Sequence, residues 1–182
     1  MTCRSAILID NFLPQNDFDS LSSKVAASPY YTSGQFEEPR DDLCREAREL
    51  VLQRLQDINL YQPHFQEAAQ LFGYNQFRPA GYGHGNIYGP HVDNGGYVFY
   101  IHPHWDENWG GRLTITNAVE EEYKSIYAKP NRFIWIEPST LHDVSSTSAE
   151  AEHSRVTNIA FMGGNIHTNP TGTEYINIFT TS

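Results

Sequence analysis

The sequence changes character near residue 74, and this change most constrains the fold. Before it, an apolar stripe of period 3.6 runs over residues 41–58 and predicts a helix that packs one face on a core. Asp41 and Asp42 stand where negative charge favours a helix start. After residue 74, short β-type runs are separated by Gly, Pro and Asn turns. Many short strands with such turns predict a β-sandwich or a barrel-like jelly roll.

Other elements follow from local patterns. Residues 7–9 are predicted to form a short strand, and two further short helices are expected, at residues 17–27 and 63–72. The clearest strands of the second half are rich in β-branched and aromatic residues and cover residues 133–136, 156–162 and 175–179. The expected fold class is therefore mainly β with N-terminal helices (α+β).

Length and charge limit the possible functions. A chain of 182 residues is expected to form a single domain over 1–182, with helical N-terminal support at 1–73 and a jelly-roll core at 74–182. The formal net charge of −10 argues against nucleic acid as a partner, because phosphate binding needs clustered Lys and Arg. The sequence does not predict the oligomeric state.

Cysteine content and apolar runs give an expected location. Cys3 and Cys44 provide no disulfide framework. The opening apolar run is too short for a secretory signal, and no stretch reaches the roughly 18 apolar residues of a membrane span. We therefore expect a cytoplasmic protein that has no membrane partner.

The second half contains a possible set of metal ligands. His91 and Asp93 are two residues apart, so on a strand their side chains would point to one face. His142, from a distant strand, could complete the set. Two histidines and one carboxylate leave three octahedral positions open, which is the arrangement of non-haem Fe(II) oxygenases. Arg155 could supply a cation for a carboxylate of a cosubstrate. By itself, the His91–Asp93 pair also fits a polar loop after Gly89–Pro90.

The surrounding residues strengthen this interpretation. Tyr100-Ile101 ends an apolar run after the His91–Asp93 pair, and a Trp109-Gly110-Gly111-Arg112-Leu113 turn follows. His142 comes after the apolar run 133–136, and Arg155 opens the run 156–162. In this order of motifs, residues 74–162 resemble the prolyl 4-hydroxylase-like branch of the 2-oxoglutarate/Fe(II)-dependent dioxygenases. A weaker resemblance lies at residues 7–13, which look like the opening strand of that family.

The resemblance implies a fold, a cofactor and site residues. It implies a double-stranded β-helix (jelly-roll) core with His91, Asp93 and His142 as iron ligands that form the catalytic centre. It also implies that Arg155 and Tyr100 bind the distal carboxylate of 2-oxoglutarate. The implied cofactor is Fe(II), the cosubstrates are 2-oxoglutarate and O2, and ascorbate is a candidate reductant. The family often has Asn two residues after this tyrosine, whereas this chain has His102.

The implied activity is hydroxylation of an unactivated C–H bond, with release of succinate and CO2. Related halogenases lack the ligand carboxylate, so the presence of Asp93 favours hydroxylation. By family analogy alone, the expected substrate is a prolyl residue of a peptide or protein. A free amino acid or another small metabolite is the alternative.

Other interpretations are left open. A non-catalytic jelly-roll module that binds a metal or ligand would use the same three residues, although structural zinc sites normally have four protein ligands. A zinc hydrolase is a lesser alternative, since no general base stands beside the set. His102 and His104 form an H-x-H pair that could bind metal, but a polar strand end is favoured. Further candidates for the pocket are the loop 28–40, His84, Asn86 and Tyr88.

Overall fold

The computed structural model describes residues 4–28, 31, 42–60, 72–75, 89–148, 150–161 and 163–180. Within these ranges the chain forms two helices, a short 3-10 helix at Glu107–Trp109 and nine strands. The helices and strands are α1 (Gln15–Ala26), α3 (Asp42–Asp57), β1 (Ala6–Ile9), β2 (Phe72–Asn75), β3 (Gly96–Tyr100), β4 (Leu113–Asn117), β5 (Glu122–Ile126), β6 (Phe133–Ile136), β7 (Leu141–Val144), β8 (Val156–Phe161) and β9 (Ile176–Ile178).

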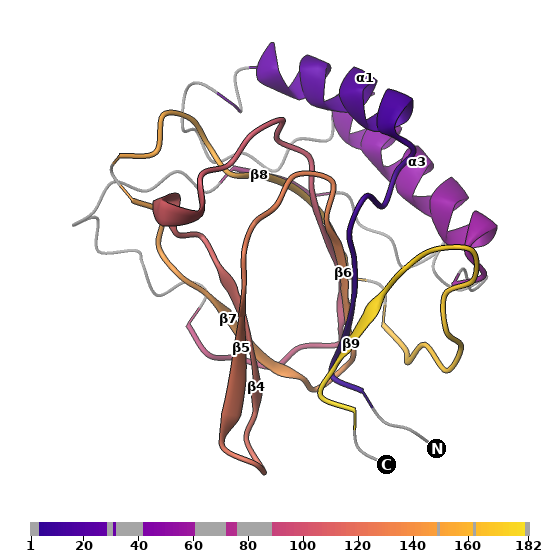
Figure 1. Cartoon of the computed structure of the whole chain (residues 1–182), viewed down its shortest axis with the longest axis vertical. Helices are drawn as coiled ribbons and strands as arrows, with labels where there is room; N and C mark the ends of the chain where they lie inside the picture. The colour runs from indigo at the N-terminus through magenta and orange to yellow at the C-terminus, as the bar shows by residue number, and fades with distance from the viewer. Residues whose placement is uncertain are drawn as a thin grey trace.

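The strands form two antiparallel sheets. The larger has the order β2-β8-β3-β6-β1-β9, and the smaller has the order β5-β4-β7. Figure 1 shows the strands curving around a common interior, with α1 and α3 lying side by side outside β8 and β6. The predicted mainly β fold with a jelly-roll core is confirmed. No helix in the described part of the chain is long and apolar enough to cross a bilayer.

Alternating side chains place the large sheet between two apolar cores. On β3, Tyr97 and Phe99 point to the helix side and pack with Ala47, Val51 and Leu55 of α3. The alternate residues of the large sheet face the small sheet, where they form a second core with Trp105, Trp109, Leu113, Ile115, Ile134 and Ile136. This period-two pattern orients the residues between the sheets.

The predicted elements agree well with the structure. The predicted helix at residues 17–27 is α1, which begins at Gln15, directly after Pro14. The predicted helix at residues 41–58 is α3, and the four strands predicted most clearly are β1, β6, β8 and β9. The helix expected at residues 63–72 falls mainly outside the described residues, but its last residue, Phe72, already belongs to β2.

Two features of the fold were not anticipated. β1 lies inside the large sheet between β6 and β9, so the sheet takes a strand from the part of the chain expected to be helical support. β5 was not predicted because its first four residues are exposed, which removes the apolar alternation of a strand. The division of the chain at residue 74 into support and core stays a prediction.

Candidate metal centre and cosubstrate pocket

The three predicted ligands meet between the end of the loop 89–95 and β7. His91 and His142 form an isolated antiparallel bridge, in which each backbone N–H donates to the other's carbonyl oxygen at 3.0 Å. Their ring centroids are 4.4 Å apart. Asp93 Oδ2 lies 3.6 Å from His142 Nε2. One ligand atom from each of the three residues lies within 4.8 Å of the others, so the group could hold a metal ion.

Backbone carbonyls fix the orientation of both imidazoles. Nδ1 of His91 lies 2.7 Å from the carbonyl oxygen of Gly89, and Nδ1 of His142 lies 2.8 Å from that of Thr140. A carbonyl only accepts, so in each neutral ring Nδ1 carries the hydrogen and Nε2 keeps its lone pair. This is the tautomer that a metal ligand requires, and such contacts by the other ring nitrogen orient metal-binding histidines.

The carboxylate is also held in place. Oδ1 of Asp93 accepts a hydrogen bond from the backbone N–H of Gly95 at 2.7 Å. Its carbonyl oxygen accepts one from Ser139 at 2.9 Å, in the β6–β7 turn. Oδ2 therefore points to the imidazole of His142. Two histidine nitrogens and one carboxylate oxygen suit Fe(II), and the set leaves room for other ligands.

A small apolar cavity of about 100 Å³ adjoins these ligands. Val98 and Ile159 line it from the large sheet, whereas Leu113 and Val144 line it from the small sheet. Phe161 lies at its rim and is 46% exposed. The sequence predicted a strand that contains Ile159 and Phe161, but did not indicate that these residues would lie beside the metal centre.

Arg155 and Tyr100 lie next to each other between the two sheets. Tyr100 comes two residues after Val98 on β3, so both side chains point to the same face of the sheet. Arg155, directly before β8, comes four residues before Ile159 and points to that face too. At a rise of ~3.3 Å per residue, Arg155 and Ile159 are about 13 Å apart along the strand. The guanidinium carbon of Arg155 lies 5.7 Å from the centroid of the Tyr100 ring. Both side chains are buried, and burial raises the pKa of Tyr100, while the charge of Arg155 opposes that rise.

The Trp109-Gly110-Gly111 turn makes room for Arg155. Gly110 and Gly111 have φ values of 73° and 62°, in the left-handed region that favours glycine. A Cβ on Gly111 would lie 2.8 Å from Cδ of Arg155, so the backbone passes directly over this side chain. The two glycines thus make a tight entry into β4 and position a buried cation.

The remaining histidines do not form a second metal site in the described residues. His102 is fully buried and its ring nitrogens contact backbone atoms, whereas His104 is exposed and lies edge-on to Trp109. His153 is half-buried and stacks on Tyr31 with ring centroids 4.0 Å apart. His84, Asn86, Tyr88 and nearly all of the loop 28–40 lie outside the described residues.

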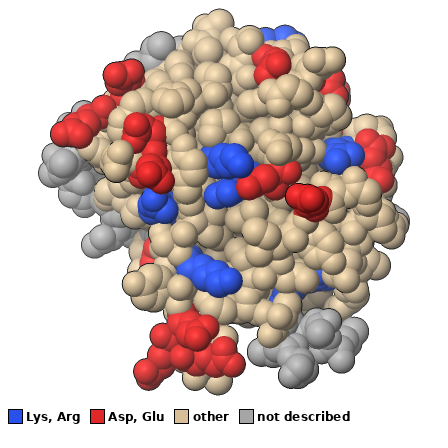
Figure 2. Space-filling model, viewed as in Figure 1, with Lys and Arg blue, Asp and Glu red and all other residues tan. Residues whose placement is uncertain are grey.

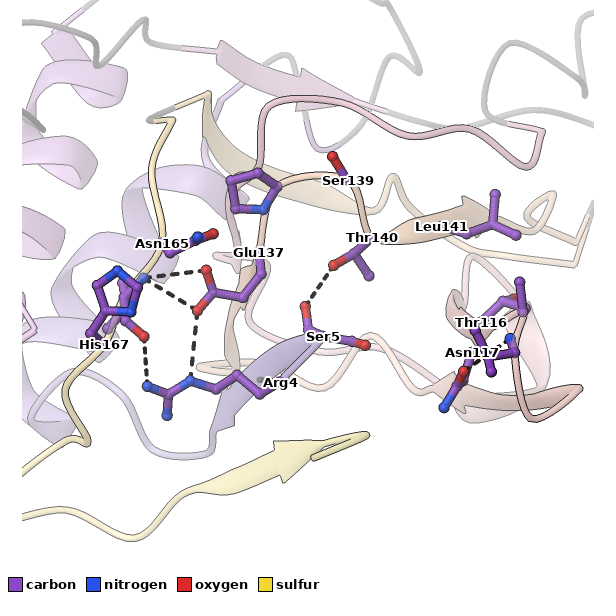
Figure 3. Close-up of a pocket in the computed structure, with 14 residues that line it drawn as sticks. Arg4, Ser5, Thr116, Asn117, Glu137, Ser139, Thr140, Leu141, Asn165 and His167 are labelled. Atoms are coloured by element: carbon purple, nitrogen blue, oxygen red, sulfur yellow. Dashed lines mark hydrogen bonds and ion pairs between the residues drawn. The ribbon is translucent and has the colours of Figure 1, made fainter. Parts of the chain in front are cut away.

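A larger cavity of about 500 Å³ lies on the other side of the β6–β7 turn (Figure 3). Its floor carries a buried pair, Arg4 and Glu137, whose Nε and Oε1 are 3.6 Å apart. Thr116 and Asn117, at the end of β4, line the opposite side. Thr140, whose carbonyl orients the ring of His142, also lines this cavity, so one residue contacts both the cavity and a predicted metal ligand.

Comparison with known proteins was informative at the family level. Residues 77–163 match the family model of the 2OG-Fe(II) oxygenase superfamily. No curated protein matches the chain. Similar solved structures include a prolyl-4-hydroxylase from Pseudomonas putida, with 14% identity, coverage of 89% of each chain and a TM-score of 0.49. Another is a prolyl hydroxylase from Trichoplax adhaerens in complex with a peptide fragment of the hypoxia inducible factor oxygen degradation domain, with 14% identity, 88% and 83% coverage and a TM-score of 0.46.

The matched segment contains all five predicted site residues. The superfamily uses Fe(II), 2-oxoglutarate and O2, and the His91–Asp93–His142 group has the donors that such an iron requires. The family match and this donor set together identify residues 77–163 as belonging to the 2OG-Fe(II) oxygenase superfamily of Fe(II)- and 2-oxoglutarate-dependent dioxygenases.

Proposed function

We propose that the chain hydroxylates an unactivated C–H bond of a peptide or protein, with a prolyl residue as the expected target. The observation that carries the hydroxylase assignment is the convergence of His91, Asp93 and His142. Both imidazoles are oriented so that the lone pair on Nε2 is available to a metal ion. Fe(II) bound there supplies the redox chemistry, in which 2-oxoglutarate and O2 give succinate and CO2 as the C–H bond becomes C–OH. Asp93 supplies a carboxylate as the third protein ligand. Because related halogenases lack this carboxylate, its presence favours hydroxylation.

We assign the cosubstrate carboxylate to Arg155 and Tyr100. Arg155 offers a fork of donors that suits a carboxylate, and the Tyr100 hydroxyl can donate a further bond. The side chains of Arg155 and Tyr100 face the space between the sheets. The cavity beside the metal ligands is lined by residues of both sheets and lies in the same space. The apolar residues Val98 and Ile159 line this space and would exclude water from the reacting groups.

The two cavities on either side of the β6–β7 turn favour a peptide over a free amino acid. The cavity at the ligands is small and apolar, which suits one apolar target group such as a proline ring. The larger cavity beyond Thr140 adds room for residues that flank the target, and Arg4, Asn117 and Glu137 supply hydrogen-bonding groups in its lining. A free amino acid would leave this second cavity unused. The cytoplasmic location stays a prediction from the sequence.

The test is turnover of defined substrates. We would incubate the protein with Fe(II), 2-oxoglutarate and ascorbate, and would screen proline-containing peptides against free amino acids. Expected products are succinate and a peptide heavier by one oxygen atom. Equal turnover of free proline would favour the small-metabolite alternative. Binding of Fe(II) and 2-oxoglutarate with no succinate from any substrate would favour a non-catalytic module.

A pair of variants tests the second cavity. Ala118 is exposed and lines this cavity, so Ala118→Trp should raise the KM for the peptide while the affinity for 2-oxoglutarate stays unchanged. Ser125→Trp places the same bulk on an exposed position of β5 outside the cavity lining and serves as the matched control. An unchanged peptide KM in Ala118→Trp would remove this cavity from the substrate site.

A further inference from the structure

His102 joins two segments of backbone through one buried ring. Its Nε2 lies 2.8 Å from the carbonyl oxygen of Ala128, which follows β5. Its Nδ1 lies 3.2 Å from the backbone nitrogen of Val156, the first residue of β8. Nδ1 also lies 3.1 Å from the carbonyl oxygen of Val156, but that carbonyl already accepts from the Ile101 N–H. The Ala128 carbonyl only accepts and makes the shorter contact, so Nε2 carries the hydrogen and Nδ1 accepts from the Val156 N–H. Full burial lowers the pKa of His102 to about 3, so the ring stays neutral.

The ring lies beside both residues assigned to the cosubstrate carboxylate. His102 comes two residues after Tyr100, and the two ring centroids are 5.8 Å apart. Val156, which His102 contacts, directly follows Arg155. The same junction has one backbone bond, from Ile101 N–H to the Val156 carbonyl at 3.1 Å. His102 therefore connects the end of β3 beyond Tyr100 with the start of β8 at Arg155.

We propose that His102 is a positioning residue for 2-oxoglutarate, one that fixes Arg155 and Tyr100 at the spacing that binds the distal carboxylate. This inference rests on the proposed function of those two residues. It also explains why an uncharged ring suits the position. A second cation would repel the Arg155 guanidinium, whereas an acidic side chain would pair with it and compete with the cosubstrate. A neutral imidazole satisfies two buried backbone groups and adds no charge beside Arg155.

Three substitutions separate the two contacts of the ring. In His102→Asn, the short amide can accept from the Val156 N–H in place of Nδ1, but it does not reach Ala128. In His102→Gln, the longer amide can donate to Ala128 in place of Nε2, but it does not serve Val156. His102→Leu has neither contact and leaves both backbone groups buried without a partner. The start of β8 should therefore keep its position best in the Asn variant.

The measurement is the affinity for 2-oxoglutarate of protein loaded with Fe(II) under anaerobic conditions. We expect a loss of about tenfold in the Leu variant, since an unsatisfied buried group costs ~1–3 kcal/mol and 1.4 kcal/mol is tenfold. The Gln variant should also weaken binding, whereas the Asn variant should stay close to wild type. Fe(II) affinity should be unchanged in all three, because the metal ligands lie elsewhere on the sheets. The Asn–Gln comparison stands even if the Leu variant does not fold.

Tyr97→Phe is the matched control for a purely structural effect. The Tyr97 hydroxyl donates a buried hydrogen bond to Asn158 Oδ1 at 2.6 Å, also between β3 and β8, but on the helix side of the sheet. This variant should lose stability and keep its affinity for 2-oxoglutarate. If the wild type does not bind 2-oxoglutarate, the proposed function fails. If the wild type binds it and the Asn, Gln and Leu variants bind it equally well, the positioning role of His102 is overturned and the proposed function stands.

Discussion

His91 and His142 face each other as a hydrogen-bonded antiparallel pair, with both backbone N···O distances at 3.0 Å. The spacing of the two imidazoles is therefore set by this backbone pairing. The carbonyls of Gly89 and Thr140 also orient the rings, so backbone atoms fix both the spacing and the orientation of the two imidazoles. Several expected outcomes depend on this arrangement.

Removing one imidazole should abolish the iron–cosubstrate complex. Under anaerobic conditions, wild-type protein with Fe(II) and 2-oxoglutarate should show a visible metal-to-ligand charge-transfer band. His91→Ala leaves only two ligands and should lose the band. His104→Ala removes an exposed histidine outside the ligand group and should keep it. A normal band in His91→Ala would show that His91 is not a ligand.

Removing the buried guanidinium should weaken cosubstrate binding while iron binding stays largely intact. In Arg155→Ala, loss of a charge-assisted contact should cost roughly 1.5–3 kcal/mol, hence about tenfold or more in the affinity for 2-oxoglutarate. Arg155→Lys keeps the charge but not the planar fork, so its affinity should be intermediate. Equilibrium titration of the Fe(II)-loaded protein measures both. Unchanged affinity in the Ala variant would assign the carboxylate to another cation.

A single methyl group on Gly111 should disturb the same contact. In Gly111→Ala, the new Cβ would lie 2.8 Å from Cδ and 3.2 Å from Nε of Arg155, so this side chain must move. Gly172→Ala is the matched control, because its φ of 68° is close to the 62° of Gly111 while no atom lies within 4 Å of the new Cβ. Both variants should lose stability through backbone strain, but only Gly111→Ala should raise the dissociation constant of 2-oxoglutarate. Equal affinities would contradict this role of Gly111.

The buried imidazole of His102 should make stability depend on pH. Its pKa is about 3 in the folded chain, against 6.5 for an ordinary histidine. Between these values the unfolded chain binds a proton that the folded chain does not, so stability is lost as the pH falls below about 6.5. On this account the free energy of unfolding should fall by up to about 1.4 kcal/mol per pH unit.

Urea denaturation of the metal-free protein measures this effect. His102→Asn has no titrating ring, so its stability should fall less on acidification than that of wild type. The stability difference between the two proteins is compared at about pH 7 and about pH 4, which removes the contributions of the other titrating groups. Parallel pH profiles would mean that the ring is accessible to protons in the folded chain.

Charge near the larger cavity should affect the choice of peptide. Figure 2 shows acidic side chains gathered at the lower tip of the molecule, where Figure 1 places the β4–β5 hairpin. Glu120, Glu121 and Glu122 are exposed there and follow Ala118 and Val119, which line the cavity. Proline peptides with flanking Lys should therefore have a lower KM than peptides with flanking Glu. The difference should shrink at high salt because exposed charges are screened. Equal KM values at low salt would exclude the hairpin from the substrate site.

The sequence alone determined the long helix, the clearest strands and the chemical types of the candidate site residues. The period-3.6 stripe of residues 41–58 required a helix with one buried face, and α3 buries Ala47, Val51 and Leu55. The spacing of His91 and Asp93, followed by His142, indicated a metal site before any fold was known. These signals are local, because periodicity and residue type are properties of neighbours in the chain.

Tertiary structure decided which atoms of those residues can act. The tautomers of His91 and His142 depend on the carbonyls of Gly89 and Thr140, and every residue has a carbonyl, so no letter of the sequence marks the two that matter. The exposed strand β5 and the buried ring of His102 were likewise invisible to patterns of hydrophobicity. Hydrogen bonds to backbone and burial between sheets arise from segments that are distant in the chain, and only folding brings those segments together.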